Sequence, residues 1–557
     1  MSEKIKITFV IEKRINDANV SHNTSDAIMS TMLKEGLVSE NFCGGRGVCK
    51  RCRIQFMDSA PIPTVVERSA FSPDELRQGY RLACMAKPRN DCVVRLDFVK
   101  SKNVDIVTEV VDIKKDEDLH ERTNLSCASG DIESDCIDFD GQLRCIIAVD
   151  LGTTTIAMQL LEIETGKIID SYCAMNPQRS YGADVLSRIQ AANTGHAKIM
   201  QEGVWKVIYD GVNRFTNKAQ ETRLTICCMC IAGNTTMEHL LMGLSTQNLG
   251  QSPFTPVELG LQKSTIAINA EDGDTVIEEA VTGNVEIEDT ANGNKTTEHK
   301  LLVYITPGIS TFVGGDIAAG LYHCKLLDTS SPKQQSIAIP NTIIQNAAIL
   351  FIDLGTNGEM AIVSGDRIVV TATAAGPAFE GGASAAVPGS DMIKVVASLL
   401  DKGIIDETGL MIEPYFSEGI DIDVLHSAAN DIIHLNQTDI RALQMAKAAV
   451  RAGIDILCSK IENCKISKVY LAGGFGYYLD VNSAIAIGLL PENLRNCTHV
   501  AGNTSLAGAF DMGKDLWSGR LTDDKLSERF SRIESINLAQ EEGFDSLYLS
   551  YVNFPER

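Results

Sequence analysis

With 557 residues, the chain is too long for a single hydrophobic core, so we expect several domains. Its 44% hydrophobic and 22% charged residues are typical of a globular protein and exclude a collagen-like, coiled-coil or largely disordered chain. The net charge of -23 argues against nucleic acid as the main partner, because such binding relies on basic side chains. We recognise neither a signal peptide nor a membrane-spanning segment, so the 16 cysteines favour a cytoplasmic protein in which clustered thiols bind metal.

Residues 1–100 are expected to form a small domain of strands and helices. Ser72 stands before Pro73 and three residues before Glu75, which is typical of a helix start. We expect that helix to run toward Arg81. The other expected elements are strands at 4–12, 53–58 and 92–99 and a helix at 24–35.

Four cysteines of this domain are spaced like the ligands of a 2Fe–2S cluster. Cys43, Cys49 and Cys52 follow the pattern C-x5-C-x2-C, and Cys84 supplies the fourth thiolate. Glycines in the loop let the backbone wrap such a cluster. A structural zinc site is the alternative, which the ferredoxin-like order of strands and helix disfavours. Cys92 falls in an expected strand and is interpreted as a packed thiol.

Basic residues surround the cysteine loop, and they have two interpretations. They would steer an acidic electron donor or dock on the acidic remainder of the chain. Alternatively, they form a solvated basic loop. The residues are Arg46, Lys50, Arg51 and Arg53.

Two polar segments are expected to lie outside the folded domains. Residues 101–145 are acidic and poor in large apolar side chains, so we interpret them as a linker. Its cysteines, Cys127, Cys136 and Cys145, follow no ligand spacing and are assigned no role. A second polar segment, near 264–300, is interpreted as an exposed insertion.

A strand, a D-x-G turn and two further strands occur twice in the remaining chain. The first copy begins at residue 146 and reaches Asp150 at the turn, and the second reaches Asp353, 203 residues later. Both copies then turn through a glycine-containing tetrad into a third strand. This is an internal duplication of a β-meander.

The duplicated turns are candidates for a nucleotide site. Neither a Walker A motif nor G-x-G-x-x-G is present, so ATP would be held differently. Two D-x-G turns can clamp a polyphosphate through backbone N–H groups and hydroxyls, while Asp150 and Asp353 organise Mg²⁺. Asp316 is the candidate for positioning water, with a simple helix N-cap as the alternative. The further binding candidates are Gly152, Thr153, Thr154, Thr155, Gly355, Thr356, Asn357, Gly358, Gly473, Gly474 and Phe475.

Two such turns followed by A-G-G-F-G (472–476) resemble the ASKHA superfamily of acetate and sugar kinases, heat-shock chaperones and actin. More specific are the phrases NPQRSYGADVLSRI, AGNTTMEHLLMG, TPGISTFVGGDIAAG, AAGPAFEGG and AIGLLP. With the cysteine-bearing domain, they make residues 1–100 and 146–557 similar to a reductive activator of corrinoid proteins.

The resemblance implies a β-grasp ferredoxin-like α+β domain at 1–100 and a duplicated α/β ATPase domain of the actin type at 146–557. It implies ATP-dependent, one-electron reduction of Co(II) to Co(I) in a corrinoid (cobalamin-binding) protein of a methyltransferase system. The implied cofactors are a 2Fe–2S cluster, ATP and Mg²⁺. The implied partners are the corrinoid protein and a low-potential electron donor such as ferredoxin or flavodoxin, and a homodimer is left open.

Three other functions fit parts of the sequence. A metabolite kinase with a fused ferredoxin would release a phosphorylated product. An activator of 2-hydroxyacyl-CoA dehydratases would bind its cluster on the ATPase domain, which the N-terminal cysteines disfavour. An electron carrier or scaffold with a silent nucleotide fold would not need both Asp150 and Asp353.

Overall fold

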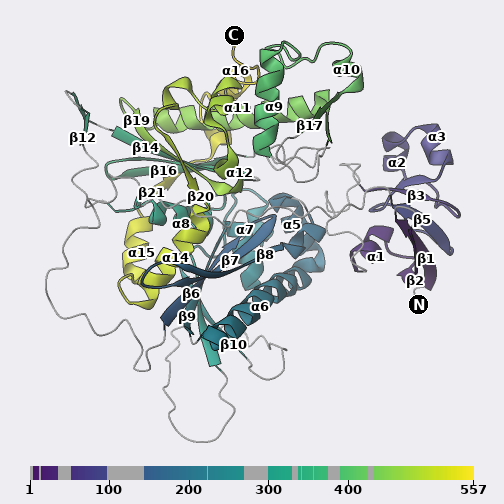
Figure 1. Ribbon diagram of the computed structural model, residues 1–557, viewed down its shortest axis with the longest axis horizontal. Helices are drawn as coiled ribbons and strands as arrows, with labels where there is room; N and C mark the ends of the chain where they lie inside the picture. Colours follow the sequence, from purple (N-terminus) through teal and green to yellow (C-terminus); the bar gives the residue numbers. More distant parts are fainter. Residues whose placement is uncertain are drawn as a thin grey trace, which may run out of the picture. The chain divides into compact units, whose positions relative to one another are not determined.

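The computed structural model describes residues 4–11, 14–34, 52–96, 143–182, 184–222, 224–268, 299–328, 336–339, 342–345, 347–355, 357–373, 389–423 and 432–556. The chain groups into two compact units (Figure 1). One comprises residues 1–105, 175–206 and 243–254, and the other comprises 106–174, 207–242 and 255–557. Within the described ranges, no helix is both long and apolar enough to cross a membrane.

The first unit contains a five-stranded sheet with the order β2-β1-β5-β3-β4. β1 pairs antiparallel with β2 and parallel with β5, and β3 joins β5 to β4. This arrangement confirms the β-grasp, ferredoxin-like domain. Its strands are β1 (Lys4–Ile11), β2 (Arg14–Asn23), β3 (Arg53–Phe56), β4 (Tyr80–Leu82) and β5 (Cys92–Leu96), and its helices are α1 (Ile28–Lys34), α2 (Val65–Ala70) and α3 (Pro73–Arg77).

Ser72 caps α3 as predicted, but this helix is shorter than expected. The Ser72 hydroxyl accepts the Glu75 N–H at 3.2 Å, and the Glu75 carboxylate accepts the Ser72 N–H at 2.7 Å. The expectation that the helix continues toward Arg81 was wrong, because it ends at Arg77 and β4 follows. Gly79 makes the turn with a φ of 88°, and a Cβ there would lie 2.2 Å from a carbonyl oxygen of β3.

The second unit contains two six-stranded sheets that repeat one topology. Their orders are β10-β11-β9-β6-β7-β8 and β20-β19-β14-β15-β16-β21. In each, a meander (β6–β8 or β14–β16) is followed by a strand parallel to its first strand, β9 or β19. The predicted internal duplication is therefore confirmed. The strands are β6 (Leu143–Leu151), β7 (Thr155–Glu162), β8 (Ile168–Met175), β9 (Leu224–Gly233), β10 (Gln262–Ile268), β11 (His299–Ile305), β14 (Ala347–Leu354), β15 (Gly358–Ser364), β16 (Arg367–Thr373), β19 (Lys465–Ala472), β20 (Thr498–Gly502) and β21 (Ile533–Ser535).

Helices and two small hairpins complete the described elements. The helices are α5 (Val185–Ala191), α6 (Ala197–Thr222), α7 (Thr235–Met242), α8 (Gly315–His323), α9 (Gly389–Asp401), α10 (Tyr415–Glu418), α11 (Gln437–Ser459), α12 (Gly473–Tyr478), α13 (Val481–Ala486), α14 (Thr504–Trp517), α15 (Asp523–Phe530) and α16 (Phe544–Ser550). The hairpins are β12 (Ser336–Ile339) with β13 (Thr342–Gln345), and β17 (Ile420–Asp423) with β18 (Ile432–Leu435).

Regular structure extends into both segments that we expected to be polar connections. β6 already begins at Leu143, where it pairs with the start of β9, so the linker boundary at residue 145 was wrong. Cys145 is fully buried in this strand. The insertion expected near 264–300 is narrower, because β10 reaches Ile268 and β11 begins at His299. Residues 97–142, with Cys127 and Cys136, and residues 269–298 lie outside the described residues.

Two helices cross from one sheet to the other. α8 follows β11 of the first sheet, but its apolar side chains share a core with Phe351 of the second. α14 follows β20 of the second sheet, but it packs on Ile146 of the first. The two helices lie side by side (Figure 1). A Cβ on Gly508 would lie 2.0 Å from the carbonyl oxygen of Ala319, so their backbones are in direct contact.

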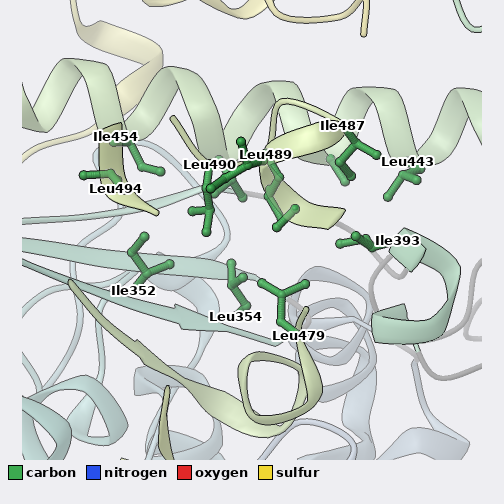
Figure 2. Packing of buried hydrophobic residues seen from close by; sticks show 14 of the residues in the cluster. Ile352, Leu354, Ile393, Leu443, Ile454, Leu479, Ile487, Leu489, Leu490 and Leu494 are labelled. Carbon is green, nitrogen blue, oxygen red and sulfur yellow. The ribbon is translucent and has the colours of Figure 1, made fainter. Parts of the chain in front are cut away.

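The second sheet packs its other face against α9 and α11. Figure 2 shows Ile352 and Leu354 of β14 facing the α11 side chains Leu443 and Ile454 across a cluster of buried isoleucines and leucines. Burying each such side chain contributes about 1.5–3 kcal/mol. This core holds β14, which carries Asp353 near its end.

A buried lysine on α11 holds the C-terminal segment. Lys447 is 1% exposed, and its Nζ donates to the carbonyl oxygens of Tyr551 and Asn553, both at 2.5 Å. It also lies 5.1 Å from the ring centroid of Phe554. Burial and the nearby Arg451 guanidinium lower the pKa of Lys447 to about 8.

This lysine should make stability depend on pH. The unfolded chain binds the proton more tightly than the folded protein, so the free energy of unfolding should rise between pH 8 and pH 10.5, by about 3 kcal/mol. We expect the difference in melting temperature between the wild type and Lys447→Met to increase from pH 8 to pH 10.5. The subtraction removes the other titrating groups, and parallel curves for the two proteins would contradict the prediction.

Candidate active site

Asp150, the first predicted aspartate, lies near the end of β6 and is oriented by two hydrogen bonds. Its carboxylate accepts from Nδ2 of Asn503 at 2.8 Å and from the hydroxyl of Ser505 at 3.0 Å. Burial raises the pKa of Asp150, and these two bonds oppose the rise. The carboxylate is therefore held in a defined orientation.

Asp353, its counterpart near the end of β14, lies beside the start of α12. Gly473 there has a φ of 86°, and a Cβ would lie 2.4 Å from Asp353 Oδ1. Only glycine fits this position without a shift of the neighbouring backbone or carboxylate. At Gly474, in contrast, an added Cβ meets no described atom within 4 Å. The role of Gly474 in nucleoside binding stays a prediction.

Asp316 lies in the first turn of α8, close to the other two aspartates. The N-cap is Gly314, so the alternative in which Asp316 is a simple N-cap was wrong. Its carboxylate accepts the Ile317 N–H at 2.8 Å. Burial and the neighbouring Asp150 carboxylate raise the pKa of Asp316 to about 7.

Two buried glutamates, which sequence reasoning missed, extend this acidic group. Glu238 of α7 accepts the Gly233 N–H at 3.2 Å and the Thr306 hydroxyl at 3.3 Å, and burial together with Asp316 raises its pKa. Burial, Asp316 and Asp353 raise the pKa of Glu359 on β15. Glu359 directly follows the second turn, in the sequence Asn357-Gly358-Glu359. The D-x-G pattern ends before this residue and therefore does not include it.

The carboxylates raise one another's pKa, so the group is suited to attract a cation. Burial, Asp316 and Asp150 raise the pKa of Asp353 to about 8. Oxygen ligands are those that Mg²⁺ prefers, and Mg²⁺ keeps several of its waters when it binds. Among the described residues no three acidic, histidine or cysteine side chains are close enough to hold a metal directly.

The other predicted binding residues lie in and after the two turns. Gly152 packs closely, since a Cβ would lie 2.8 Å from the Thr155 carbonyl oxygen. Thr153 Oγ1 accepts from Nδ2 of Asn234 at 3.0 Å. In the second turn, the Asn357 side chain hydrogen-bonds Glu359. Thr154 and Gly355 lie within these turns, and Gly358 begins β15. Thr356 and the side chain of Phe475 lie outside the described residues.

Two of the four predicted cluster ligands are described, and they lie together. The Sγ atoms of Cys52 and Cys84 are 3.3 Å apart in the buried core of the β-grasp sheet. The Ala83 N–H donates to the Cys52 carbonyl oxygen at 2.7 Å, which ties the two segments together. Cys43 and Cys49 lie outside the described residues. Cys92 is buried in β5, as expected for a packed thiol.

Arg53 begins β3, and its side chain is 43% exposed. Its guanidinium lies 2.7 Å from the Glu75 carboxylate and 4.2 Å and 5.4 Å from the ring centroids of Tyr80 and Phe71. These contacts fix it at the start of β3. Arg46, Lys50 and Arg51 lie outside the described residues.

Comparison with known protein families agrees with this architecture. Residues 145–279 match the RACo middle region, and residues 347–386 and 382–557 match the C-terminal domain of RACo, its ASKHA domain. Together these matches span more than half of the chain. This chain belongs to the RACo family. The RACo middle region covers most of the first duplicated sheet, and the RACo C-terminal domain covers the second.

Relatives of known function extend the similarity over most of the chain. It is 25% identical to the corrinoid activation enzyme RamQ of Eubacterium limosum, over 88% of this chain and 89% of that protein. It is 24% identical to the Co(II) methylated amine-specific corrinoid protein reductase of Methanosarcina barkeri, over 73% and 76%. A solved structure, the reductive activator for corrinoid, iron-sulfur protein, has a TM-score of 0.56 and 22% identity over 99% and 98%. The last match shows that this chain has the RACo-type fold.

Proposed function

We propose that this chain is an ATP-dependent reductive activator of a corrinoid protein. It takes electrons from a low-potential donor and delivers one electron to an inactive Co(II) corrinoid, which becomes Co(I) and again accepts a methyl group. The observation that carries the proposal is the presence, in one RACo-family chain, of a ferredoxin-like domain with two adjacent cysteines and of a buried acidic group on the duplicated sheets. The names of the two relatives support the same substrate class.

The ferredoxin-like domain would hold a 2Fe–2S cluster through Cys43, Cys49, Cys52 and Cys84. Such a cluster supplies one-electron transfer when it is bound. Burial of Cys52 and Cys84 in the core keeps their thiols away from water, and their 3.3 Å separation suits two ligands of one group. The chain itself contributes a short backbone tie between both cysteine segments, which fixes the distance between them.

The acidic group of Asp150, Asp316 and Asp353 would bind Mg²⁺ and ATP. Asp150 and Asp353 would hold the hydrated cation from opposite halves, and Asp316 would orient an attacking water. The turns after Asp150 and Asp353 would receive the phosphates through backbone N–H groups. α8 and α14 each cross to the opposite sheet. ATP binding and hydrolysis would therefore change the position of one duplicated half relative to the other.

Coupling to ATP is needed when the cluster potential lies above that of the cobalt couple. Each 59 mV of such a gap costs a factor of about ten in a one-electron equilibrium. We infer that nucleotide binding changes the grip on the corrinoid protein and thereby offsets this gap. We further propose a cytoplasmic location, because clustered cysteines that bind metal are typical of a reducing compartment.

The test combines the purified, iron-loaded protein with a Co(II) corrinoid protein, a low-potential reductant and Mg·ATP. We expect the absorbance of Co(I) to appear only when ATP is present. Equal Co(I) formation with and without ATP would contradict the proposal. ATP turnover that ignores the corrinoid protein and yields a phosphorylated metabolite would support the kinase alternative instead.

A further inference from the structure

The phrase A-G-N-T, followed by Thr or Ser, occurs twice in the chain, at 232–236 and at 501–505. Each copy follows a strand and begins a helix, α7 or α14. In each copy the asparagine side chain caps the helix. Oδ1 of Asn234 accepts the Met237 N–H at 3.0 Å, and Oδ1 of Asn503 accepts the Leu506 N–H at 2.9 Å.

The amide nitrogen of each asparagine makes a second contact. Nδ2 of Asn503 donates to Asp150 at 2.8 Å, and Nδ2 of Asn234 donates to Thr153 at 3.0 Å. A flipped amide would lose the cap in both copies and, at Asn503, would also place its oxygen against the Asp150 carboxylate, so the orientation is determined. Both asparagines therefore direct amide N–H donors at the D-x-G turn that begins at Asp150.

Asp150 receives a further donor from the same helix turn. Ser505 donates to Oδ1 while Asn503 donates to Oδ2, so both carboxylate oxygens are held from α14. Asn503 is 7% exposed and Ser505 is 5% exposed, so water cannot readily replace these donors. Hydrogen bonds to a charged acceptor are stronger than those between neutral groups.

We propose that Asn503 and Ser505 are positioning residues for the nucleotide site. They fix the Asp150 carboxylate so that it meets a magnesium-bound ATP in one orientation. The proposal rests on the proposed use of Asp150 in binding Mg·ATP. Because α14 contacts the backbone of α8, which carries Asp316, the same helix pair also sets the relation between these two aspartates.

The test measures ATP turnover as a function of Mg²⁺ concentration in Asn503→Ser, Ser505→Ala and the double variant. Serine at the N-cap retains an acceptor for the Leu506 N–H, so the helix keeps its cap. Residues that support a metal ligand typically contribute 10- to 100-fold to affinity. We expect half-saturation by Mg²⁺ to move about 10- to 100-fold higher, whereas kcat at saturating Mg²⁺ changes much less.

The matched control is Asn436→Ser, the same substitution at the N-cap of α11. It should lower the melting temperature to a similar degree without moving Mg²⁺ half-saturation. Half-saturation at the wild-type value in both single variants would overturn the proposal, and if Asn503→Ser fails to fold, Ser505→Ala decides alone. A wild-type protein without Mg²⁺-dependent turnover would instead contradict the proposed function.

Discussion

Replacing Cys84 with serine should remove the iron and the visible absorbance of the reconstituted protein and abolish ATP-dependent formation of Co(I). A cluster of this type needs four thiolates, and Cys84 lies 3.3 Å from a second predicted ligand, Cys52. Loss of a residue that only supports a ligand costs 10- to 100-fold, so we expect a fall of at least about 100-fold in Co(I) formation. Iron analysis, the absorbance spectrum and the corrinoid assay measure the three effects.

Cys92→Ser is the matched control for this prediction. Cys92 belongs to the same domain and is 4% exposed in β5, and burial raises the pKa of its thiol to about 12. A thiol that resists ionisation is a poor metal ligand, so this variant should keep its iron. ATP binding should survive in both variants, because Asp150, Asp316 and Asp353 belong to the other unit. A Cys84 variant with full iron content would reject the ligand assignment.

The duplicated architecture could be predicted from sequence because its signals are local. Asp150 and Asp353 each follow an apolar strand and precede a glycine turn, a pattern that a short window contains in full. The same holds for the capping box of Ser72 and Glu75. Each of these predictions needed only the period of a strand or the geometry of one turn.

The residues that complete the site escaped prediction because their contacts span the chain. Asn503 and Asp150 are 353 positions apart and meet only because α14 crosses to the sheet that carries β6. Strand and helix periods contain no information about such a crossing. The recurrence of A-G-N-T was present in the sequence, and comparing the two copies would have drawn attention to Asn234 and Asn503.

The glycines show a second reason for incomplete prediction. Gly473 and Gly474 are both predicted to bind the nucleotide. The approach of α12 to Asp353 requires a glycine at Gly473, whereas an added Cβ on Gly474 would meet no described atom within 4 Å. Gly79 was not singled out, although its left-handed conformation ends the helix that we expected to continue. A sequence identifies the glycine, but the neighbouring backbone determines why it is required.

Asp353→Asn should lower activity without lowering stability. The substitution keeps the shape of the side chain but removes the negative charge that attracts Mg²⁺. A bound metal ion contributes several kcal/mol of charge stabilisation, so we expect ATP turnover to fall by about 10²- to 10³-fold. Without nucleotide, the melting temperature should be unchanged or higher, because burial and the Asp316 and Asp150 carboxylates disfavour the charged form of Asp353.

ATP turnover and the melting temperature together distinguish a functional carboxylate from a structural one. If Asp353 only held the turn in place, its substitution would lower the melting temperature along with turnover. Asp366→Asn makes the same change in the exposed turn between β15 and β16 of the same sheet, and should alter neither quantity. Natural sites commonly retain groups that reduce stability in return for activity. Wild-type turnover in Asp353→Asn would show that the acidic group does not act on Mg·ATP through this residue.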